Sequence, residues 1–333
     1  TEENSNKAIG WEAKLKGHLL ELLVILGREF REQNRTNRNA RYFPPSLVYR
    51  ALSYIEENYH RQLRLEDISS IVGLSPDYFS KVFKELIGLS PMEYLKILRI
   101  AKACEIGRKE GAGIIGLGAF TAIPGDGGRM VDELTRVLVT TGNTYTVVTA
   151  IEGAMEAASR MGVDIPTSTL AVVGASGSIG SAVAEVLADR VGSLVLVGRD
   201  QKKLANLSER VGVKNKNVKA STSLSSIRPA DIIITVTGAT NTVVDPDDIK
   251  PGAVVCDVAR PRDVAELVIK KRKDVLVIDG GIVKVPGQVD LHAVLGLPKG
   301  MALACVAETM MLALEGRYES YTIGKDISIE KIQ

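Results

Sequence analysis

The chain has 333 residues, of which 45% are hydrophobic and 25% are charged, and its formal net charge is +2. This composition predicts a soluble globular protein of about two domains. No run approaches the roughly 18 apolar residues of a membrane-spanning helix, and the N-terminus lacks a basic-then-apolar signal pattern. The three cysteines (Cys104, Cys256, Cys305) and three histidines are scattered. This argues against disulfides and a metal site and favours a reducing, cytoplasmic compartment.

The composition changes near residue 100. Eleven of the fifteen aromatic residues lie in residues 1–100, which carry 15 Lys and Arg against 13 Asp and Glu. The remainder is rich in Val, Ile, Ala and Gly and carries 27 basic against 27 acidic residues. We expect a boundary there. The expected parts are a helical segment (1–100), a substrate-side region of helices and loops (101–165), a nucleotide-binding domain (166–299) and a C-terminal helix and tail (300–333).

The first expected helix spans residues 11–33. Its apolar side chains form one stripe, which predicts an amphipathic helix in the core or at a homodimer interface. The stripe consists of Leu15, Leu19, Leu22, Leu23, Leu26 and Phe30. Residues 34–45 are polar and then Pro-rich and predict a loop. Residues 46–59 predict a second helix with Ser46 as its N-cap.

Residues 65–100, LEDISSIVGLSPDYFSKVFKELIGLSPMEYLKILRI, predict two short helices joined by a glycine turn. Gly73 ends the first helix, and Ser75 caps the second, with Pro76 at its first position. A helix-turn-helix can place its second helix in the major groove of DNA, although many helical bundles contain the same geometry.

This stretch, with ALSYIEENY before it, resembles the first helix-turn-helix of AraC-type transcription regulators over residues 46–100. The resemblance implies DNA as a candidate partner. It places Ser75, Asp77, Tyr78, Ser80, Lys81 and Lys84 on or beside the recognition helix. The family joins two such units by a long helix, whereas here no second unit follows residues 91–100. A single unit should bind DNA weakly unless it dimerises, because affinity grows with the number of phosphate contacts. The alternative is a segment that only packs or dimerises.

From Leu170 onward, short apolar strands alternate with polar helices. The expected strands are LAVVG, SLVLVGR, ADIIITVTGA, GAVVCDVA and DVLVIDGG, and the expected helices include SIGSAVAEVLADRV and QKKLANLSERV. This alternation predicts an α/β fold with a Rossmann-like, doubly wound parallel sheet, preceded by the all-α helix-turn-helix segment.

The stretch LAVVGASGSIG predicts a dinucleotide site, because a strand, a glycine loop and a helix follow one another. Glycines let the backbone approach a pyrophosphate, and the helix N-terminus attracts it. The predicted contacts are Gly174, Ala175, Ser176, Gly177, Ser178, Ile179 and Gly180. A glycine turn without a ligand is the alternative.

The second strand ends at Arg199, where an NAD site usually has an acidic residue. A guanidinium pairs bidentately with phosphate, so Arg199, with Lys202 and Lys203 behind it, favours NADP(H). Asp200 keeps NAD open, and a solvated charge is the alternative for Arg199. Two loops after later strands are candidates for the nicotinamide side or simple glycine turns. They contribute Thr235, Thr237 and Gly238, and Asp279, Gly280 and Gly281.

Two stretches are candidates for the reacting end. Thr141, Gly142, Asn143 and Thr144 precede a helix and predict either ligand contacts or a helix cap. The helix in KGMALACVAETMMLALEG carries Cys305 and, three residues later, Glu308, which could equally face solvent. A cysteine in an apolar helix is most often a small hydrophobe. We expect Cys256 in the core and Cys104 as a helix filler.

Residues from about 110 to 333 resemble long-chain acyl-[acyl-carrier-protein] reductases. The matching stretches, in order, are GLGAFTAI, TTGNTYT, LAVVGASGSIGSAV, DGGIV and ACVAETMMLALEG. The resemblance implies NADPH, an acyl-carrier protein or acyl-CoA substrate, a fatty aldehyde product, and catalysis by Cys305 with Glu308 in the same helix. Thioester attack needs a thiolate, and no His near Cys305 in sequence explains its activation. The family has a substrate region before GLGAFTAI, where this chain has the regulator-like segment.

Two other functions stay open from the sequence. One is a DNA-binding regulator or sensor whose nucleotide fold senses a metabolite. The other is a non-catalytic NADP-binding protein or a shikimate-dehydrogenase-like enzyme, since the chain more distantly resembles shikimate dehydrogenase and glutamyl-tRNA reductase. No convincing Lys–Asp substrate dyad of the shikimate enzyme is evident.

Overall fold

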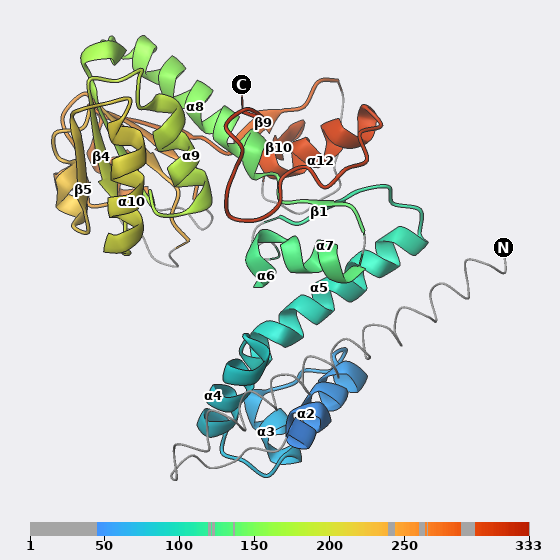
Figure 1. Cartoon of the computed structure of the whole chain (residues 1–333). Coiled ribbons are helices and arrows are strands. Elements are labelled where there is room, and N and C mark those ends of the chain that lie inside the picture. The colour runs from blue at the N-terminus through green and yellow to red at the C-terminus, as the bar shows by residue number, and fades with distance from the viewer. Residues whose placement is uncertain are drawn as a thin grey trace. The chain divides into compact units, whose positions relative to one another are not determined.

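The computed structural model describes residues 45–118, 121, 124–135, 137–238, 244–259, 264, 266–287 and 297–332. The chain divides into two compact units, Thr1–Ala103 and Cys104–Gln333 (Figure 1). The predicted helix of residues 11–33, and the homodimer suggested for it, lie outside the described residues. Within the described residues, no helix has the length and apolar character needed to cross a membrane.

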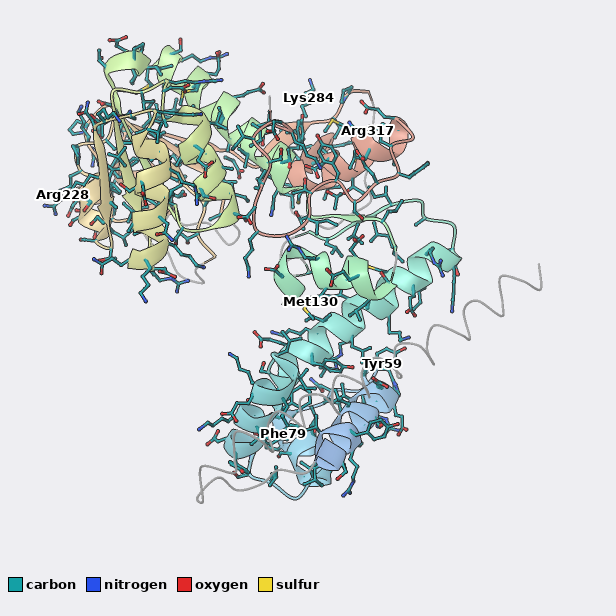
Figure 2. All side chains as sticks on the ribbon, viewed as in Figure 1. Tyr59, Phe79, Met130, Arg228, Lys284 and Arg317 are labelled. Atoms are coloured by element: carbon teal, nitrogen blue, oxygen red, sulfur yellow. The ribbon has the colours of Figure 1, made fainter. Side chains whose placement is uncertain are left out.

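The first unit is helical. It contains α2 (Pro45–Asn58), α3 (Leu65–Ile71), α4 (Pro76–Ile87) and the beginning of α5 (Pro91–Lys109). Phe79 and Phe83 of α4 are fully buried in its apolar core, with 5.5 Å between their ring centroids (Figure 2 labels Phe79). Gly73, in the turn between α3 and α4, has a φ of +70°, which glycine adopts without steric cost. The predicted helix-turn-helix is therefore confirmed.

The ends of two helices in this unit show how the sequence sets their boundaries. Because α2 begins at Pro45, Ser46 lies inside its first turn and is not the predicted N-cap. Proline suits the first helical position because its φ is helical and no amide is required there. Before α5, the Ser90 amide donates to Glu93 Oε2 (2.9 Å). This bond is the main reason why the pKa of Glu93 is lowered.

The second unit is built on a parallel sheet. Its strands are β3 (Thr169–Val173), β4 (Ser193–Val197), β5 (Val218–Ser221), β6 (Ile232–Thr235), β7 (Val254–Asp257) and β8 (Leu276–Asp279). Their spatial order, β5-β4-β3-β6-β7-β8, is that of a doubly wound dinucleotide-binding fold. The predicted fold class is confirmed. The edge strand β5 was not predicted, because its residues are half-buried or exposed and form no apolar run.

Both faces of the sheet are covered. Helices α8 (Asn143–Arg160), α9 (Ser178–Leu187) and α10 (Gln201–Gly212) cover one face, and α11 (Glu266–Lys271) packs on the other (Figure 1). Successive residues of β3 alternate between the two cores: Leu170 and Val172 face the first, and Ala171 and Val173 face the second. Burial on both faces explains why the central strands are continuous apolar runs.

Shorter elements lie beside the sheet. They are β1 (Ile115–Gly116), α6 (Pro124–Gly127), α7 (Arg129–Thr135), β2 (Val139–Thr140), β9 (Ile282–Lys284), β10 (Met301–Leu303) and α12 (Ala304–Leu314). Strand β1 pairs in parallel with β2, and β9 pairs antiparallel with β10. Strand β10 leads directly into α12, and α8 runs from the sheet to α12 (Figure 1). These short strands were not predicted, because two or three residues carry no recognisable alternation.

Candidate active site

The glycine loop lies at the point where the strand order reverses, between β3 and β6. The amides of Gly174 and Ala175 donate to the Val197 carbonyl (2.8 and 3.0 Å). Gly174 has a φ of +89°, and a Cβ there would lie 2.9 Å from the Val236 carbonyl oxygen. A Cβ on Gly180 would lie 2.4 Å from the Gly174 carbonyl oxygen. The backbone of the fold therefore requires these two glycines.

Gly177, the third glycine, has a different reason to be glycine. It is the N-cap of α9, has an ordinary φ of −87°, and a Cβ there would meet nothing closer than the Gly174 carbonyl oxygen at 3.3 Å. A methyl group would thus fit here only after a shift of a few tenths of an ångström, far less than Gly180 would require. Its absence leaves the N-terminus of α9 open to a ligand, as a dinucleotide pyrophosphate requires.

A cavity of about 640 Å³ adjoins this N-terminus. Ser176, Gly177 and Ser178 line one side, and Asn143, the first residue of α8, also reaches it. The charged residues of its wall are Asp126, Arg129, Lys203, Arg210, Lys325 and Asp326. The cavity is therefore polar and suits a ligand with anionic groups.

Arg199 and Asp200, at the end of β4, favoured NADP(H) and NAD respectively in the sequence, and the structure gives them different surroundings. Asp200 Oδ1 accepts the Lys203 amide (3.1 Å) and thereby caps α10. The Arg199 side chain is exposed at the same strand end. A Cβ on Gly198 would lie 2.9 Å from Ser176 Oγ, so this strand end lies against the glycine loop. The acidic group is thus used by the helix cap.

The predicted cofactor contacts at the end of β6 and in the loop after it differ in burial. Thr235 is fully buried and its hydroxyl donates to Asp257 Oδ1 (3.0 Å), so Thr235 lies behind the edge of the sheet. Thr237 is half-buried and Gly238 is exposed, which places both at the edge itself. Asp257 also accepts the amide of Val264 (3.0 Å). Sequence reasoning missed Asp257, although its position at the end of a buried strand was a usable signal.

The loop after β8 joins the sheet edge to the cysteine helix. A Cβ on Gly280 would lie 2.3 Å from Cys256 Sγ, so only glycine fits without displacement. Asp279 Oδ1 accepts the Gly281 amide (3.2 Å), and the Gly281 carbonyl accepts the Ala304 amide (2.9 Å). The residue that follows Ala304 is Cys305. The candidate nicotinamide-side loop and the candidate nucleophile are therefore neighbours in space.

Cys305 is the second residue of α12 and is half-buried. A Cβ on Gly118 would lie 3.7 Å from its Sγ. Backbone amides and the positive end of the dipole at a helix N-terminus favour a thiolate. The other cysteines lie in environments that disfavour ionisation: burial raises the pKa of Cys256 to about 12 and that of Cys104 to about 11.

Glu308 is buried, with 2% of its surface exposed, which excludes the solvent-facing alternative. Its carboxylate accepts the Thr140 hydroxyl (2.5 Å), the Thr322 hydroxyl (2.9 Å) and the Tyr145 amide (2.8 Å). These bonds join α12 to the end of β2, the first turn of α8 and the C-terminal tail. Sequence reasoning missed Thr322, because nothing in its local pattern distinguishes it.

The predicted substrate-side stretch, residues 141–144, has four distinct environments. Gly142 packs against Cys305, and Asn143 lines the cavity. The hydroxyls of Thr144 and Thr322 are hydrogen-bonded to each other (2.7 Å). Thr141 is buried, and within the described residues its hydroxyl has no hydrogen-bond partner. The structure thus brings this stretch to both the cysteine and the cavity.

The predicted DNA-contacting residues lie on α4 of the helical unit. Ser75, Asp77, Lys81 and Lys84 are exposed, and Tyr78 and Ser80 are half-buried. The buried face of the helix holds Phe79 and Phe83. The helix therefore has one face in the core and another that carries the predicted residues.

Two family models match separate parts of the chain. Bacterial regulatory helix-turn-helix proteins of the AraC family match residues 55–96, and shikimate/quinate 5-dehydrogenases match residues 156–279. The long-chain acyl-[acyl-carrier-protein] reductase of Synechococcus elongatus is 32% identical over 250 residues, which are 71% of this chain and 72% of that protein. The chain belongs to the long-chain acyl-[acyl-carrier-protein] reductase family. The predicted resemblances to this reductase family and to AraC-type regulators are both confirmed.

Two further relatives share only parts of their length with this reductase-family chain. Aminotransferase PigE of a Serratia species is 30% identical over 241 residues, which are 70% of this chain and 28% of PigE. Regulatory protein PocR of Salmonella typhimurium is 34% identical over 88 residues, which are 26% of this chain and 29% of PocR. The chain therefore spans less than a third of either protein.

Proposed function

We propose that this reductase-family chain converts a long-chain fatty acyl thioester, carried by acyl-carrier protein or coenzyme A, to a fatty aldehyde through an acyl-enzyme on Cys305. The observation that carries the proposal is the position of Cys305 in the first turn of α12, one residue after the amide bonded to Gly281. This arrangement supports the proposal, because the nucleophile would then lie beside the edge of the sheet where such folds bind a nicotinamide. Family membership supports the substrate class.

NADP(H) fits the residues present. The close approach of Gly174 to the β6 loop and the open N-cap at Gly177 form a cradle for a pyrophosphate. Arg199, with Lys202, would hold the 2′-phosphate, since Asp200 is used as a helix cap. Thr237, Gly238 and the 279–281 loop would border the nicotinamide. When bound, NADPH supplies the hydride for the reduction.

The chain's own residues would perform the acyl transfer. Cys305 Sγ forms a bond to the thioester carbonyl carbon, and the bond from that carbon to the carrier sulfur breaks. The carrier thiolate leaves and takes up a proton. The amides of the first turn of α12 would hold Cys305 as a thiolate. Glu308 would act as a positioning residue, because its carboxylate is occupied by Thr140, Tyr145 and Thr322.

The test mixes the purified chain with NADPH and either palmitoyl-CoA or palmitoyl-acyl-carrier protein. Absorbance of reduced nicotinamide and aldehyde formation are followed together. We expect turnover in the parent chain, none in Cys305→Ser, and parent activity in Cys104→Ala, whose cysteine lies outside the site. Full turnover by Cys305→Ser would refute this nucleophile. Tight NADPH binding without oxidation would refute the reductase and favour a non-catalytic NADP-binding protein.

A second candidate function, DNA binding, is favoured by the exposed face of α4 and the AraC-family match over residues 55–96. Lys81 and Lys84 would contact phosphates, while Asp77 and Tyr78 lie nearer the N-terminal end that enters a groove in this motif. A single unit offers few phosphate contacts, so binding should be weak and strongly dependent on salt.

Gel shifts at low salt, with and without NADPH, test this second function. We expect the double variant Lys81→Ala, Lys84→Ala to lose the shift, and Lys96→Ala, an exposed lysine on α5, to retain it. If the parent chain gives no shift under either condition, the helix-turn-helix has only a structural role.

A further inference from the structure

Thr141 has an unusual environment for a polar side chain. Only 2% of its surface is exposed, and no described residue pairs with its hydroxyl. A buried hydroxyl without a partner loses its bonds to water and gains none in return. The neighbouring Thr140, by contrast, donates to Glu308 at 2.5 Å. One of these two adjacent threonines is therefore satisfied by the fold, and the other is not.

The Thr141 backbone belongs to the wall of the cysteine site. Its amide donates to the Thr322 carbonyl (2.9 Å), so the C-terminal tail holds the residue in place. The next residue, Gly142, packs directly against Cys305. The Thr141 hydroxyl is thus carried by a fixed backbone next to the contact with the nucleophile.

The Thr141 methyl group and the Leu117 side chain both lie near Gly128. A Cβ on Gly128 would lie 3.6 Å from Thr141 Cγ2 and 2.9 Å from Leu117 Cδ1, so the two side chains share one neighbourhood. Leu117 is followed by Gly118, whose Cβ position is 3.7 Å from Cys305 Sγ. Thr141, through Gly142, and Leu117, through Gly118, are therefore each one residue from backbone that lies near Cys305.

We propose that the Thr141 hydroxyl donates a hydrogen bond to the carbonyl oxygen of the acyl thioester when Cys305 attacks it. The inference rests on the proposed function and adds a catalytic residue to it. As the Sγ–C bond forms, the carbonyl π electrons move onto the oxygen that Thr141 binds. When the C=O bond re-forms, the bond to the carrier sulfur breaks, and the carrier thiolate takes a proton from solvent. The Thr141 proton stays on its own oxygen throughout.

This role explains why no residue in the described part of the chain pairs with the hydroxyl. A donor kept for an atom of the substrate has no partner until the substrate is present, and it needs no reorganisation when charge develops on the oxygen. Removing it should therefore have opposite effects on stability and on reactivity, which a purely structural hydroxyl would not show.

The experiment measures acylation of Cys305 in the intact chain by palmitoyl-CoA without NADPH, in a single turnover followed by intact-protein mass. The variants are Thr141→Val, which replaces the hydroxyl by a methyl, and Thr141→Ser, which retains it. We expect Thr141→Val to be acylated about tenfold to a thousandfold more slowly, the range seen for loss of one oxyanion donor. Thr141→Ser should recover most of the rate.

Two further measurements separate catalysis from structure. Alkylation of Cys305 by iodoacetamide creates no charge on a carbonyl oxygen bound by Thr141, so Thr141→Val should be alkylated at the parent rate. Its Tm should equal or exceed that of the parent, because an unpartnered buried hydroxyl is removed. The matched variant Thr140→Val should have a lower Tm, because Glu308 loses a donor.

The outcomes are distinct. Slow acylation with unchanged alkylation supports the proposal. Acylation of Thr141→Val at the parent rate overturns it. If the acylation rate, the alkylation rate and the Tm of Thr141→Val are all lowered together, Thr141 has a structural role, which also overturns the proposal. If neither palmitoyl-CoA nor palmitoyl-acyl-carrier protein acylates the parent chain while iodoacetamide alkylates Cys305, the proposed function itself fails, and this inference fails with it.

Discussion

The backbone of Gly142 lies directly against Cys305: a Cβ on Gly142 would stand 2.2 Å from Cys305 Cα and 2.4 Å from its Cβ. Gly142 is also the N-cap of α8 and has a φ of +74°. The first turns of α8 and α12 therefore meet at this contact, and a glycine is required there both for its φ and for its missing side chain.

Replacing Gly142 by alanine should damage the site more than strain alone can explain. Gly162 is a matched control, because its φ is +73° and a Cβ there would meet nothing within 4 Å. We expect Gly162→Ala to destabilise the chain by about 1–2 kcal/mol, the cost of a left-handed alanine. Gly142→Ala should lose more than this, together with Cys305 reactivity. Denaturant melts and thiol alkylation measure both. Equal losses in the two variants would contradict the packing argument.

The glycine loop offers a second matched pair. Gly180→Ala should lower the Tm, because its Cβ would meet the Gly174 carbonyl oxygen at 2.4 Å. Gly177→Ala should lower the Tm less than Gly180→Ala does, since its nearest atom, the Gly174 carbonyl oxygen, is 3.3 Å away and has to shift by only a few tenths of an ångström. We expect Gly177→Ala to weaken NADPH binding by about tenfold or more, because a methyl at the N-cap obstructs the approach of a pyrophosphate. Fluorescence titration with NADPH tests this. Unchanged affinity would show that the cofactor does not approach this residue.

Arg199 should distinguish NADPH from NADH. We expect Arg199→Ala to weaken NADPH binding by about tenfold to a hundredfold, the value of a charge-assisted hydrogen bond, and to leave NADH binding unchanged. Asp200→Asn serves as the control, because asparagine also caps helices and the carboxylate is already used by the Lys203 amide. If Arg199→Ala weakens both cofactors equally, the residue does not recognise the 2′-phosphate.

Thiol labelling should identify Cys305 in the native chain. Burial raises the pKa of Cys104 to about 11 and that of Cys256 to about 12, so both stay protonated from pH 7 to 9. Half-buried Cys305 lies at a helix N-terminus. We expect iodoacetamide to modify Cys305 first and the two others only after denaturation. Peptide mass mapping reads the order. Native labelling of Cys256 before Cys305 would contradict the assignment.

Cys256 should also make stability depend on alkaline pH. Burial, followed by the charges of Asp257 and Asp279, raises its pKa from the ordinary 9.0 to about 12. As the pH rises, the thiol therefore loses its proton in the unfolded state before it does so in the folded state. The free energy of unfolding consequently decreases between about pH 9 and about pH 12. Urea unfolding at pH 8 and pH 10 measures the fall. The free energy of unfolding of Cys256→Ala should decrease less between pH 8 and pH 10. An equal decrease in the parent and the variant would exclude a contribution from Cys256.

How far the sequence predicted the fold depends on burial. Strands β3, β4, β6 and β7 are buried on both faces, β8 is half-buried, and all five are readable as apolar runs. Strand β5 could not be predicted in this way, because Val218–Ser221 is an edge strand whose side chains are half-buried or exposed. Strands β9 and β10 could not be predicted either, because they are stabilised by pairing with each other and by contact with α12. No local sequence pattern encodes these contacts. The prediction of Ser46 as the N-cap was wrong, because it relied on the serine hydroxyl and did not consider that Pro45 can begin the helix.

The site was predictable where its chemistry is local. The glycine loop and Arg199 follow one another along the chain, so motif and spacing suffice. The environment of Glu308 depends on Thr140, which is 168 positions away, and on Thr322 in the tail. The contact between Gly142 and Cys305 likewise exists only after β1, β2 and α12 have assembled. Tertiary contacts of this kind leave no mark in a single sequence.

The bond between the Gly281 carbonyl and the Ala304 amide connects the loop that we propose borders the nicotinamide with the first residue of the cysteine helix. A molecule that shifts one of the two displaces the other. Thermodynamic reciprocity then requires that, if a nicotinamide alters the free energy of acylating Cys305, the acyl group alters cofactor affinity by the same factor. The two substrates would then influence each other's binding through this connection, without any additional moving part.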